Sequence, residues 1–229
     1  MTDNLKDIIK KEYLKCALDC EYFLRKYSYI QVPNKGRQLF DLFDYQADAL
    51  VAFRDHKYNI LLKGRQIGIS TLVAGYALWR MLFKRDEQIL VIAIKQEVAK
   101  NLVTKVKFMH QLLPVWLRGD LVEDNKLTLR FGNGSTIKAT ATRESAGRSE
   151  ALSLLIIDEA AFIDKIDTKP LNYFRSIVKD TIYRGSVIVS LPTESMGSLA
   201  GKVRDHVNLY GEFAQLENRW ISGRFQPLN

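Results

Sequence analysis

Residues 63–71 read KGRQIGIST, and they lie between an apolar run at 59–62 and an apolar stretch at 72–83 with helical character. A strand, a glycine-containing turn that closes on Ser or Thr, and then a helix form an element suited to binding phosphate. The N–H groups of the turn and the start of the helix direct partial positive charge at an anion. The stretch therefore predicts an anion-binding turn at the end of a strand.

This turn meets the nucleotide-binding signature G-x-x-x-x-G-K-[ST] only in part. Gly68 and Ser70 are in register, whereas Ile69 occupies the lysine position and Lys63 the first glycine position. Since Ile69 cannot neutralise a phosphate, Lys63 and Arg65 are the cations that the turn offers. We predict that Lys63 contacts the β- and γ-phosphates; the alternative is a surface lysine that follows a strand.

The pattern around the turn predicts an α/β fold whose sheet is largely parallel and flanked by helices. Helices are expected at 70–83 and at 96–113, where Pro114 ends the second one. The apolar runs that alternate with them read as buried strands, at 59–62, 88–94, 153–157 and 186–189.

The remaining segments add smaller elements. The spacing of apolar residues predicts an amphipathic helix over 3–26, followed by a polar loop at 31–37. A short helix is expected to end near Arg54. An Asn-Gly turn between the strands 127–131 and 135–141 predicts a hairpin. Further helices are expected after Pro170 and from residue 198.

Composition narrows the functional classes. The chain has 229 residues, of which 47% are apolar and 26% charged, as expected for one globular domain. Neither a membrane span nor a signal peptide is expected. Cys16 and Cys20 read as free thiols, and the histidines as structural or surface residues. A net charge of +8 permits nucleic-acid binding, but the lysines around 95–107 can equally be solvated helix faces.

Polar residues follow several of the predicted strands. Ligands of open α/β sheets bind outside the carboxyl ends of the strands, so these polar residues are expected to meet. They are the turn at 63–71, the pair Asp158–Glu159, and the segment from Ser190 to Thr193. This convergence makes the prediction of one phosphate site more specific than the turn alone.

Each residue expected at the carboxyl ends of the strands can have a chemical role or a purely structural one. Ser70 can ligate Mg²⁺ or only cap the helix. Asp158 can hold Mg²⁺, usually through water, and Glu159 can orient or deprotonate an attacking water; two adjacent acids can also be surface residues. Arg148 can stabilise charge on a phosphoryl group or pair with a nearby glutamate.

A weaker signal precedes the first strand of the sheet. Tyr45 and Gln46 lie about a dozen residues before it, and a glutamine amide can read an adenine edge while a tyrosine stacks nearby.

Together these motifs resemble the N-terminal ATPase domain of the large terminase subunit of tailed bacteriophages. The resemblance is carried by GRQIGIST at 64–71, LLIIDEAAFI at 154–163 and VSLPT at 189–193, with LFDYQ at 42–46 similar to the adenine motif. It implies a P-loop NTPase with a RecA-like core. The lysine at the front of the turn resembles a deviant form of the family's motif.

The resemblance also implies roles for individual residues. Ser70 and Asp158 would hold Mg²⁺, Glu159 would be the catalytic carboxylate, and Arg148 an arginine finger; Lys63 would contact the terminal phosphate. Ser190, Pro192 and Thr193 would couple hydrolysis to movement. The residues expected around ATP are Tyr45, Gln46, Lys63, Gly64, Arg65, Gln66, Gly68, Ile69, Ser70 and Thr71.

At the level of the whole protein, the resemblance implies Mg²⁺-dependent ATP hydrolysis that drives double-stranded DNA into a procapsid. The implied partners are DNA, further copies in a ring, the portal and the small terminase subunit, in the cytoplasm of an infected bacterium. We expect one ATPase domain, with a lid-like segment at 1–45, a core at 46–197 and a second lid-like segment at 198–229. No nuclease domain is expected in this chain.

Two other functions fit parts of the pattern. One is a helicase-like ATPase with a single core domain, which would need a second core to supply its arginines. The other is a scaffold that binds nucleotide or DNA without hydrolysis, with Ile69 marking lost catalysis. Asp158, Glu159 and Lys63 argue against this loss.

Overall fold

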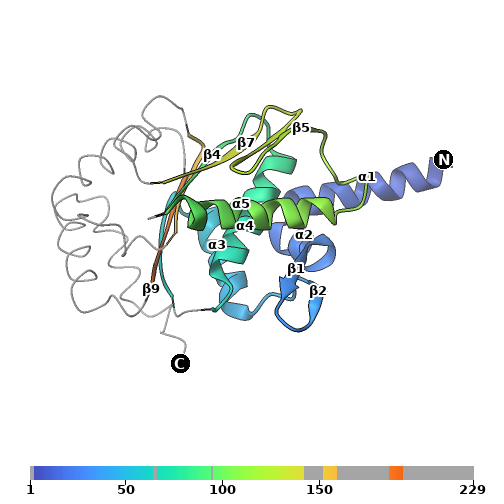
Figure 1. The fold of residues 1–229 in the computed structure, drawn as a ribbon. Coiled ribbons are helices and arrows are strands. Elements are labelled where there is room, and N and C mark those ends of the chain that lie inside the picture. The colour runs from blue at the N-terminus through green and yellow to red at the C-terminus, as the bar shows by residue number, and fades with distance from the viewer. Residues whose placement is uncertain (1–2, 64–65, 94, 142–151, 159–185, 193–229) are drawn as a thin grey trace.

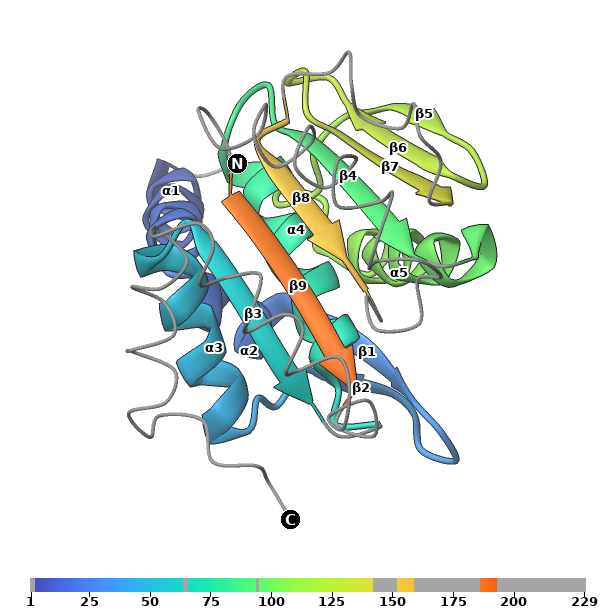
Figure 2. The same cartoon turned by 90° about the vertical axis from the view of Figure 1, so that its left-hand side faces the viewer.

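The computed structural model describes residues 3–63, 66–93, 95–141, 152–158 and 186–192. Its centre is a seven-stranded sheet with the strand order β3-β9-β8-β4-β7-β6-β5 (Figures 1 and 2). The strands are β3 (Tyr58–Lys63), β4 (Gln88–Ala93), β5 (Leu121–Asp124), β6 (Thr128–Phe131), β7 (Thr136–Ala141), β8 (Leu154–Ile157) and β9 (Ser186–Pro192).

Five neighbouring strands, from β3 to β7 in the sheet order, run parallel, and β6 and β5 extend the sheet antiparallel. This confirms the expected α/β class with a largely parallel sheet. The four residues of β8 are all buried, as is β4 after Gln88. Continuous apolar strands of this kind are typical of a sheet interior.

The helices α3 (Asp44–Asp55), α4 (Ile69–Phe83) and α5 (Gln96–Gln111) lie on one face of the sheet (Figures 1 and 2). Most of α4 is buried, and Leu72, Ala77 and Leu78 are fully so. It packs against α5 and, through Gly75, closely against Leu24: a methyl group at Gly75 would come within 2.7 Å of that leucine. α4 is therefore the central helix of the core.

The N-terminal region differs from the sequence-based expectation. Two helices, α1 (Asp3–Leu18) and α2 (Cys20–Tyr27), replace the single helix predicted over 3–26. The chain is extended at Asp19, whose side chain accepts a hydrogen bond of 3.0 Å from the backbone N–H of Tyr22. The prediction of one continuous helix was wrong because Asp19 caps a new helix instead of continuing the first.

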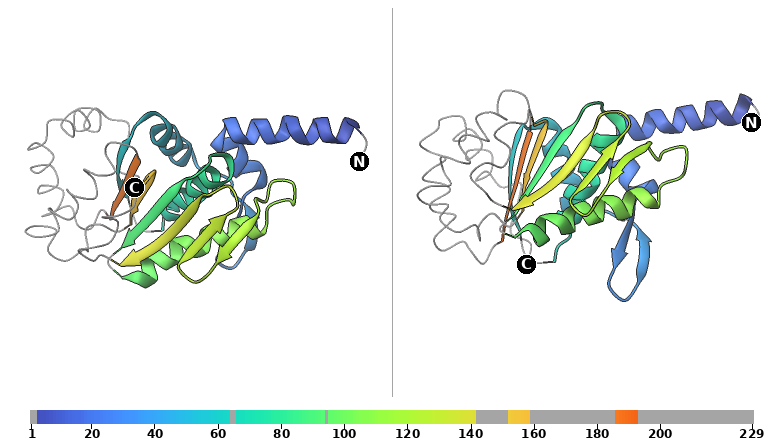
Figure 3. Two further views of the ribbon diagram at one scale, coloured as in Figure 1. Left: turned by 90° about the horizontal axis from the view of Figure 1, so that it is seen from above. Right: turned by 45° about the horizontal axis from the view of Figure 1, so that its top comes forward.

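The predicted loop at 31–37 also proves to be structured. It holds most of a small hairpin of β1 (Tyr29–Val32) and β2 (Gly36–Leu39) (Figure 3). Asn34 in its turn and Gly36 at the start of β2 have positive φ. The predicted hairpin at 127–141 is confirmed as β6 and β7, to which β5 adds a strand that the sequence did not indicate. The helices expected after Pro170 and from residue 198 lie outside the described residues.

The cysteines and one of the histidines agree with the prediction. Cys16 and Cys20 are free thiols, and burial raises the pKa of Cys16 to about 12. Buried His110 packs on the ring of Phe131 at a centroid distance of 4.9 Å, and burial lowers its pKa, so it is a structural residue. None of the helices in the described ranges is long and apolar enough to cross a bilayer.

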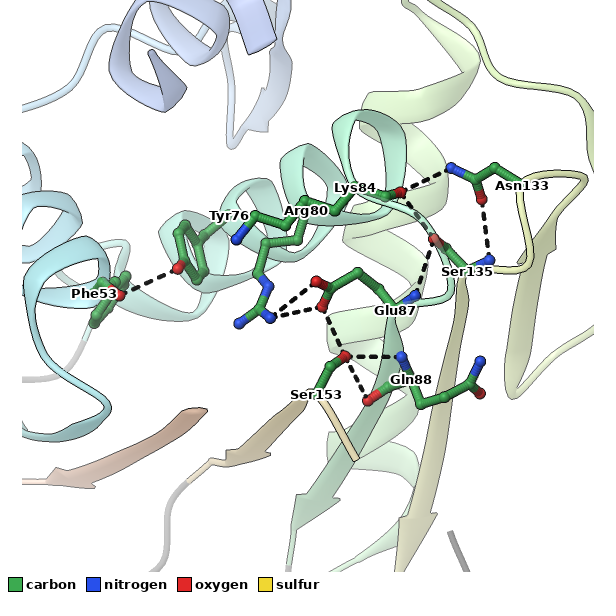
Figure 4. A network of polar contacts seen from close by, with 9 residues as sticks. All are labelled: Phe53, Tyr76, Arg80, Lys84, Glu87, Gln88, Asn133, Ser135 and Ser153. Carbon is green, nitrogen blue, oxygen red and sulfur yellow. Dashed lines mark hydrogen bonds and ion pairs between the residues drawn. The ribbon is translucent and has the colours of Figure 1, made fainter. Parts of the chain in front are cut away.

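A buried polar network ties the last turn of α4 to the amino ends of two strands (Figure 4). One guanidinium nitrogen of Arg80 lies 2.7 and 3.0 Å from the carboxylate oxygens of Glu87. The hydroxyl of Ser153 donates to Glu87 at 2.7 Å and accepts from the backbone N–H of Gln88 at 2.8 Å. The network thus fixes where β4 and β8 begin relative to α4.

Candidate functional site

The turn of 63–71 follows a strand and opens a helix, as the sequence predicted. β3 ends at Lys63, whose backbone pairs in register with Pro192 at the end of β9. Gly68 precedes α4 with φ of +78°, and Gln66 also has positive φ at +60°. Left-handed residues within a turn are a common part of anion-binding backbone concavities. This turn therefore has backbone features that suit it to hold an anion.

Ser70, Asp158 and Ser190 meet at the carboxyl edge of the sheet, although 120 positions separate the first from the last. The Ser70 hydroxyl donates to Asp158 Oδ2 at 2.9 Å, and the Ser190 hydroxyl donates to Oδ1 at 2.5 Å. Asp158 is 7% exposed, and its backbone N–H donates to the carbonyl of Ile92 at 3.0 Å. Both carboxylate oxygens are thus held by hydroxyl groups from different elements.

These oxygen atoms are of the type that Mg²⁺ prefers. Mg²⁺ takes oxygen ligands, keeps several waters and commonly uses one or two carboxylates, so a hydroxyl beside one fixed carboxylate is a suitable donor set. Within the described ranges, no group of three or more His, Cys, Asp or Glu side chains offers an alternative metal centre. Ser70 and Asp158 therefore fit a magnesium site.

Tyr45 and Gln46, both on α3, contact the turn directly. The Tyr45 hydroxyl donates to the carbonyl of Ile67 at 2.6 Å, and Gln46 Nε2 donates to the same carbonyl at 3.2 Å. Gln46 Oε1 accepts from the backbone N–H of Phe43 at 3.2 Å, and the residue is 2% exposed. That these two side chains hold the turn itself was not predicted from the sequence.

Gly68 is required by this contact as well as by its backbone conformation. A methyl group added at Gly68 would lie 2.7 Å from Gln46 Nε2, closer than non-bonded atoms allow. The glutamine of α3 and the glycine of the turn are consequently one packing unit.

Ile69, which stands at the lysine position of the signature, is 4% exposed and belongs to the apolar core. A lysine there would place an ammonium group among apolar neighbours unless its chain reached out of the core. This burial agrees with a turn that takes its cation from another position. Thr71 follows within the first turn of α4, its N–H bonded to the carbonyl of Gly68 at 3.1 Å.

Several predicted site residues lie outside the described residues. They are Gly64, Arg65, Arg148, Glu159 and Thr193, and for Lys63 the structure describes the backbone but not the side chain. Their expected roles stay predictions.

The lysines around 95–107, for which the sequence left nucleic-acid binding and a solvated helix face equally open, are partly neutralised. On α5, Lys100 pairs with Glu97 at 3.3 Å, and Lys107 pairs with Asp124 of β5 at 2.5 Å. For these two lysines the alternative, a helix face on which acids and bases mix, is the better description.

The parallel sheet, with its glycine turn between β3 and α4 and its polar strand ends, has the architecture of P-loop NTPases. A model of the family described as "Terminase large subunit, T4likevirus-type, N-terminal" matches residues 60–201. Because this match covers well over half of the 229 residues, the chain belongs to that family.

Solved structures support the fold. The large terminase of bacteriophage HK97 has a TM-score of 0.62 and 18% identity, over 77% of this chain and 37% of that chain. A variant of the large terminase ATPase domain of Thermus phage P74-26 has a TM-score of 0.51 and 18% identity, over 66% of this chain and 65% of that one. The chain thus spans about a third of the first protein and two thirds of the second.

Proposed function

We propose that this chain is a Mg²⁺-dependent ATPase domain that drives translocation of double-stranded DNA during viral genome packaging. The observation that carries the proposal is the contact of 2.9 Å between Ser70, at the start of the helix after the turn, and Asp158, at the end of a buried strand. A hydroxyl and a carboxylate in these places suit the metal–triphosphate unit of P-loop enzymes.

Each residue has a defined task in this proposal. Ser70 binds Mg²⁺ through its hydroxyl, and Asp158 holds the ion through water. Bound Mg²⁺ would neutralise charge on the β- and γ-phosphates. The turn and the first N–H groups of α4 bind the phosphates, and Lys63 at the end of β3 supplies the ammonium that Ile69 cannot.

Groups outside the described residues complete the proposed chemistry. Glu159, next to Asp158 in the chain, orients or deprotonates the attacking water. Arg148 stabilises the charge that develops on the transferred group, a contribution of about 10³–10⁵ in rate in comparable enzymes.

The link from hydrolysis to movement is proposed to run through β9. Ser190 donates directly to Asp158, so a change in the ligands of Asp158 alters a contact at the end of β9. Pro192 ends that strand beside Lys63, and Thr193 follows it. The DNA, the ring of further copies, the portal and the small subunit belong to the proposal through the family.

Phosphate release by the purified chain tests this function, with double-stranded DNA present and at protein concentrations that favour assembly. We expect Glu159→Gln to abolish turnover and Lys63→Ala to lower turnover or nucleotide affinity strongly. Ile69→Val is the matched comparison, because it trims a core residue by one methyl group at a cost of about 1 kcal/mol. Equal losses in Lys63→Ala and Ile69→Val would refute the role of Lys63.

A parallel measurement separates the competing functions. Binding of a fluorescent ATP analogue is followed for the same variants. A chain that binds the analogue with Mg²⁺ and releases no phosphate, with or without DNA, would be a scaffold and would overturn the proposal. Turnover that is stimulated by single-stranded but not by double-stranded DNA would favour the helicase-like alternative.

A further inference from the structure

Exposed apolar side chains are concentrated on α1. Five large ones lie on this one helix, and Leu18, Ile8 and Leu14 are 84%, 55% and 51% exposed. The other two are Leu5 and Tyr13. Single exposed apolar residues are ordinary on protein surfaces, but a group of them commonly marks an interaction site. α1 is therefore a candidate interface.

The second half of α1 is firmly attached to the domain. Glu12 accepts hydrogen bonds from Lys26 at 2.7 Å and from Tyr27 at 2.8 Å, and Trp79 Nε1 donates to the carbonyl of Cys16 at 2.8 Å. The first half extends away from the rest of the described structure (Figures 1 and 3). An isolated helix of 16 residues is marginal in water, so this attachment holds the projecting half in place.

A groove of about 570 Å³ lies between α1 and Trp116. Ile9, Tyr13 and Leu14 contribute apolar surface to it, and Lys6 and Lys10 carry positive charge at its border. These two lysines are spaced i, i+4, so they lie on the same side of the helix. Val115, next to Trp116 in the chain, is 84% exposed and extends the apolar surface.

We propose that this groove between α1 and Trp116 binds an acidic amphipathic helix of a partner protein. An apolar groove of this kind accepts residues at i, i+3, i+4 and i+7 of a helix. The two lysines at the border favour carboxylates on the flanks of that helix, because complementary charge steers and orients association.

Other occupants fit the groove less well. A second copy that used its own α1 would bring Lys6 and Lys10 against the same lysines, and like charges oppose contact. A membrane-bound helix needs one continuous apolar face. On α1, Asp7 lies seven and eleven residues before Leu14 and Leu18, on the same stripe as these leucines. A charged side chain there interrupts the apolar face that such a helix would insert into a bilayer.

The test lets the groove select its ligand. A displayed library of 18-residue helices carries Leu, Ile, Val, Phe or Met at the apolar positions and Glu, Lys or Gln on the flanks. It is sorted for binding to the full chain and against Leu14→Asp, a change at a position that is 51% exposed. We expect the enriched helices to carry Glu on their flanks.

Charge reversal then tests the lysines. For one enriched peptide, Lys6→Glu/Lys10→Glu should weaken binding by about tenfold and reverse the preference toward a matched peptide with Lys flanks. The control is Lys35→Glu/Lys126→Glu, which makes the same change of net charge at exposed positions outside α1 and should leave the affinity unchanged. Circular dichroism confirms that every variant is folded.

Five results would overturn the proposal. Sorting yields no helix that distinguishes the chain from Leu14→Asp, or enriches Lys flanks as often as Glu flanks. The control variant weakens binding as much as the α1 variant does. Light scattering finds a dimer of the unmodified chain that Leu14→Asp dissociates, which would make a second copy the occupant. Vesicles of phosphatidylserine bind the chain, and Leu14→Asp abolishes that binding.

Discussion

Gly68→Ala tests whether the turn and Gln46 form one packing unit. The substitution has two costs. Alanine at φ of +78° pays about 1–2 kcal/mol for the left-handed conformation. Its methyl group also meets Gln46 Nε2 at 2.7 Å, so the amide must move and give up its hydrogen bond to Ile67, at about 1 kcal/mol. We expect a total loss of about 2–3 kcal/mol in the free energy of unfolding.

Gly36→Ala is the matched control within the same chain. Gly36 has a similar φ of +72°, but a methyl group there would meet nothing within 4 Å. It pays the conformational cost without the contact, and both alanines restrict the unfolded chain equally. The difference between the two variants, about 1 kcal/mol, therefore reports the contact with Gln46.

Urea unfolding of both variants and of Gln46→Ala/Gly68→Ala provides the measurement. If the contact with Gln46 causes the extra loss, the double variant costs about 1 kcal/mol less than the sum of the two single variants. For a domain of this size, each kcal/mol corresponds to about 2–4 °C in melting temperature, so thermal unfolding resolves the difference. Equal losses in Gly68→Ala and Gly36→Ala, or strict additivity with Gln46→Ala, would refute the reasoning.

Two further predictions concern the ion pairs. Arg80→Met leaves the buried carboxylate of Glu87 without its cation and should cost about 3–5 kcal/mol in urea unfolding. Arg80→Met/Glu87→Leu should recover most of this loss, and an equally unstable double variant would contradict the explanation. Hydrogen bonds, of which the one from Lys26 has the largest effect, lower the pKa of Glu12 to about 2 from an ordinary value of 4.5. The stabilisation that these hydrogen bonds provide is complete above pH 4.5 and is lost as the pH falls toward 2. The deficit in melting temperature of Glu12→Gln should therefore shrink over that range. A deficit that does not change with pH would disprove this role of Glu12.

The sequence predicted the elements that depend on strong local patterns. Apolar runs located β3, β4, β8 and β9, because a strand with both faces covered leaves a continuous hydrophobic signal. The fifth parallel strand, β7, was located by the Asn-Gly turn that precedes it. The polar residues after those runs predicted that Ser70, Asp158 and Ser190 would converge, and the structure places them in hydrogen-bond contact.

What the sequence did not indicate depends on tertiary contacts or on weak signals. Asp19 can be read either as a polar residue within a helix or as the cap of a new one, and only the packing of α2 decides between them. β5 has four exposed residues and therefore no pattern of burial. Gln46 was predicted to read adenine, but its contact with Ile67 crosses 21 positions and has no sequence signature.

Polar contacts at both ends of the parallel strands hold α4 in register with β8. α4 carries Ser70 in its first turn and Arg80 in its last, about 15 Å apart at 1.5 Å per residue. Asp158 follows β8 and Ser153 precedes it, so they lie about 16 Å apart along the strand. Ser70 contacts Asp158 directly at one end, and Arg80 reaches Ser153 through Glu87 at the other. Because the two lengths match, helix and strand are held in register at both ends. The buried ion pair of Arg80 and Glu87, far from the turn at 63–71, therefore helps to set the position of Ser70 against Asp158.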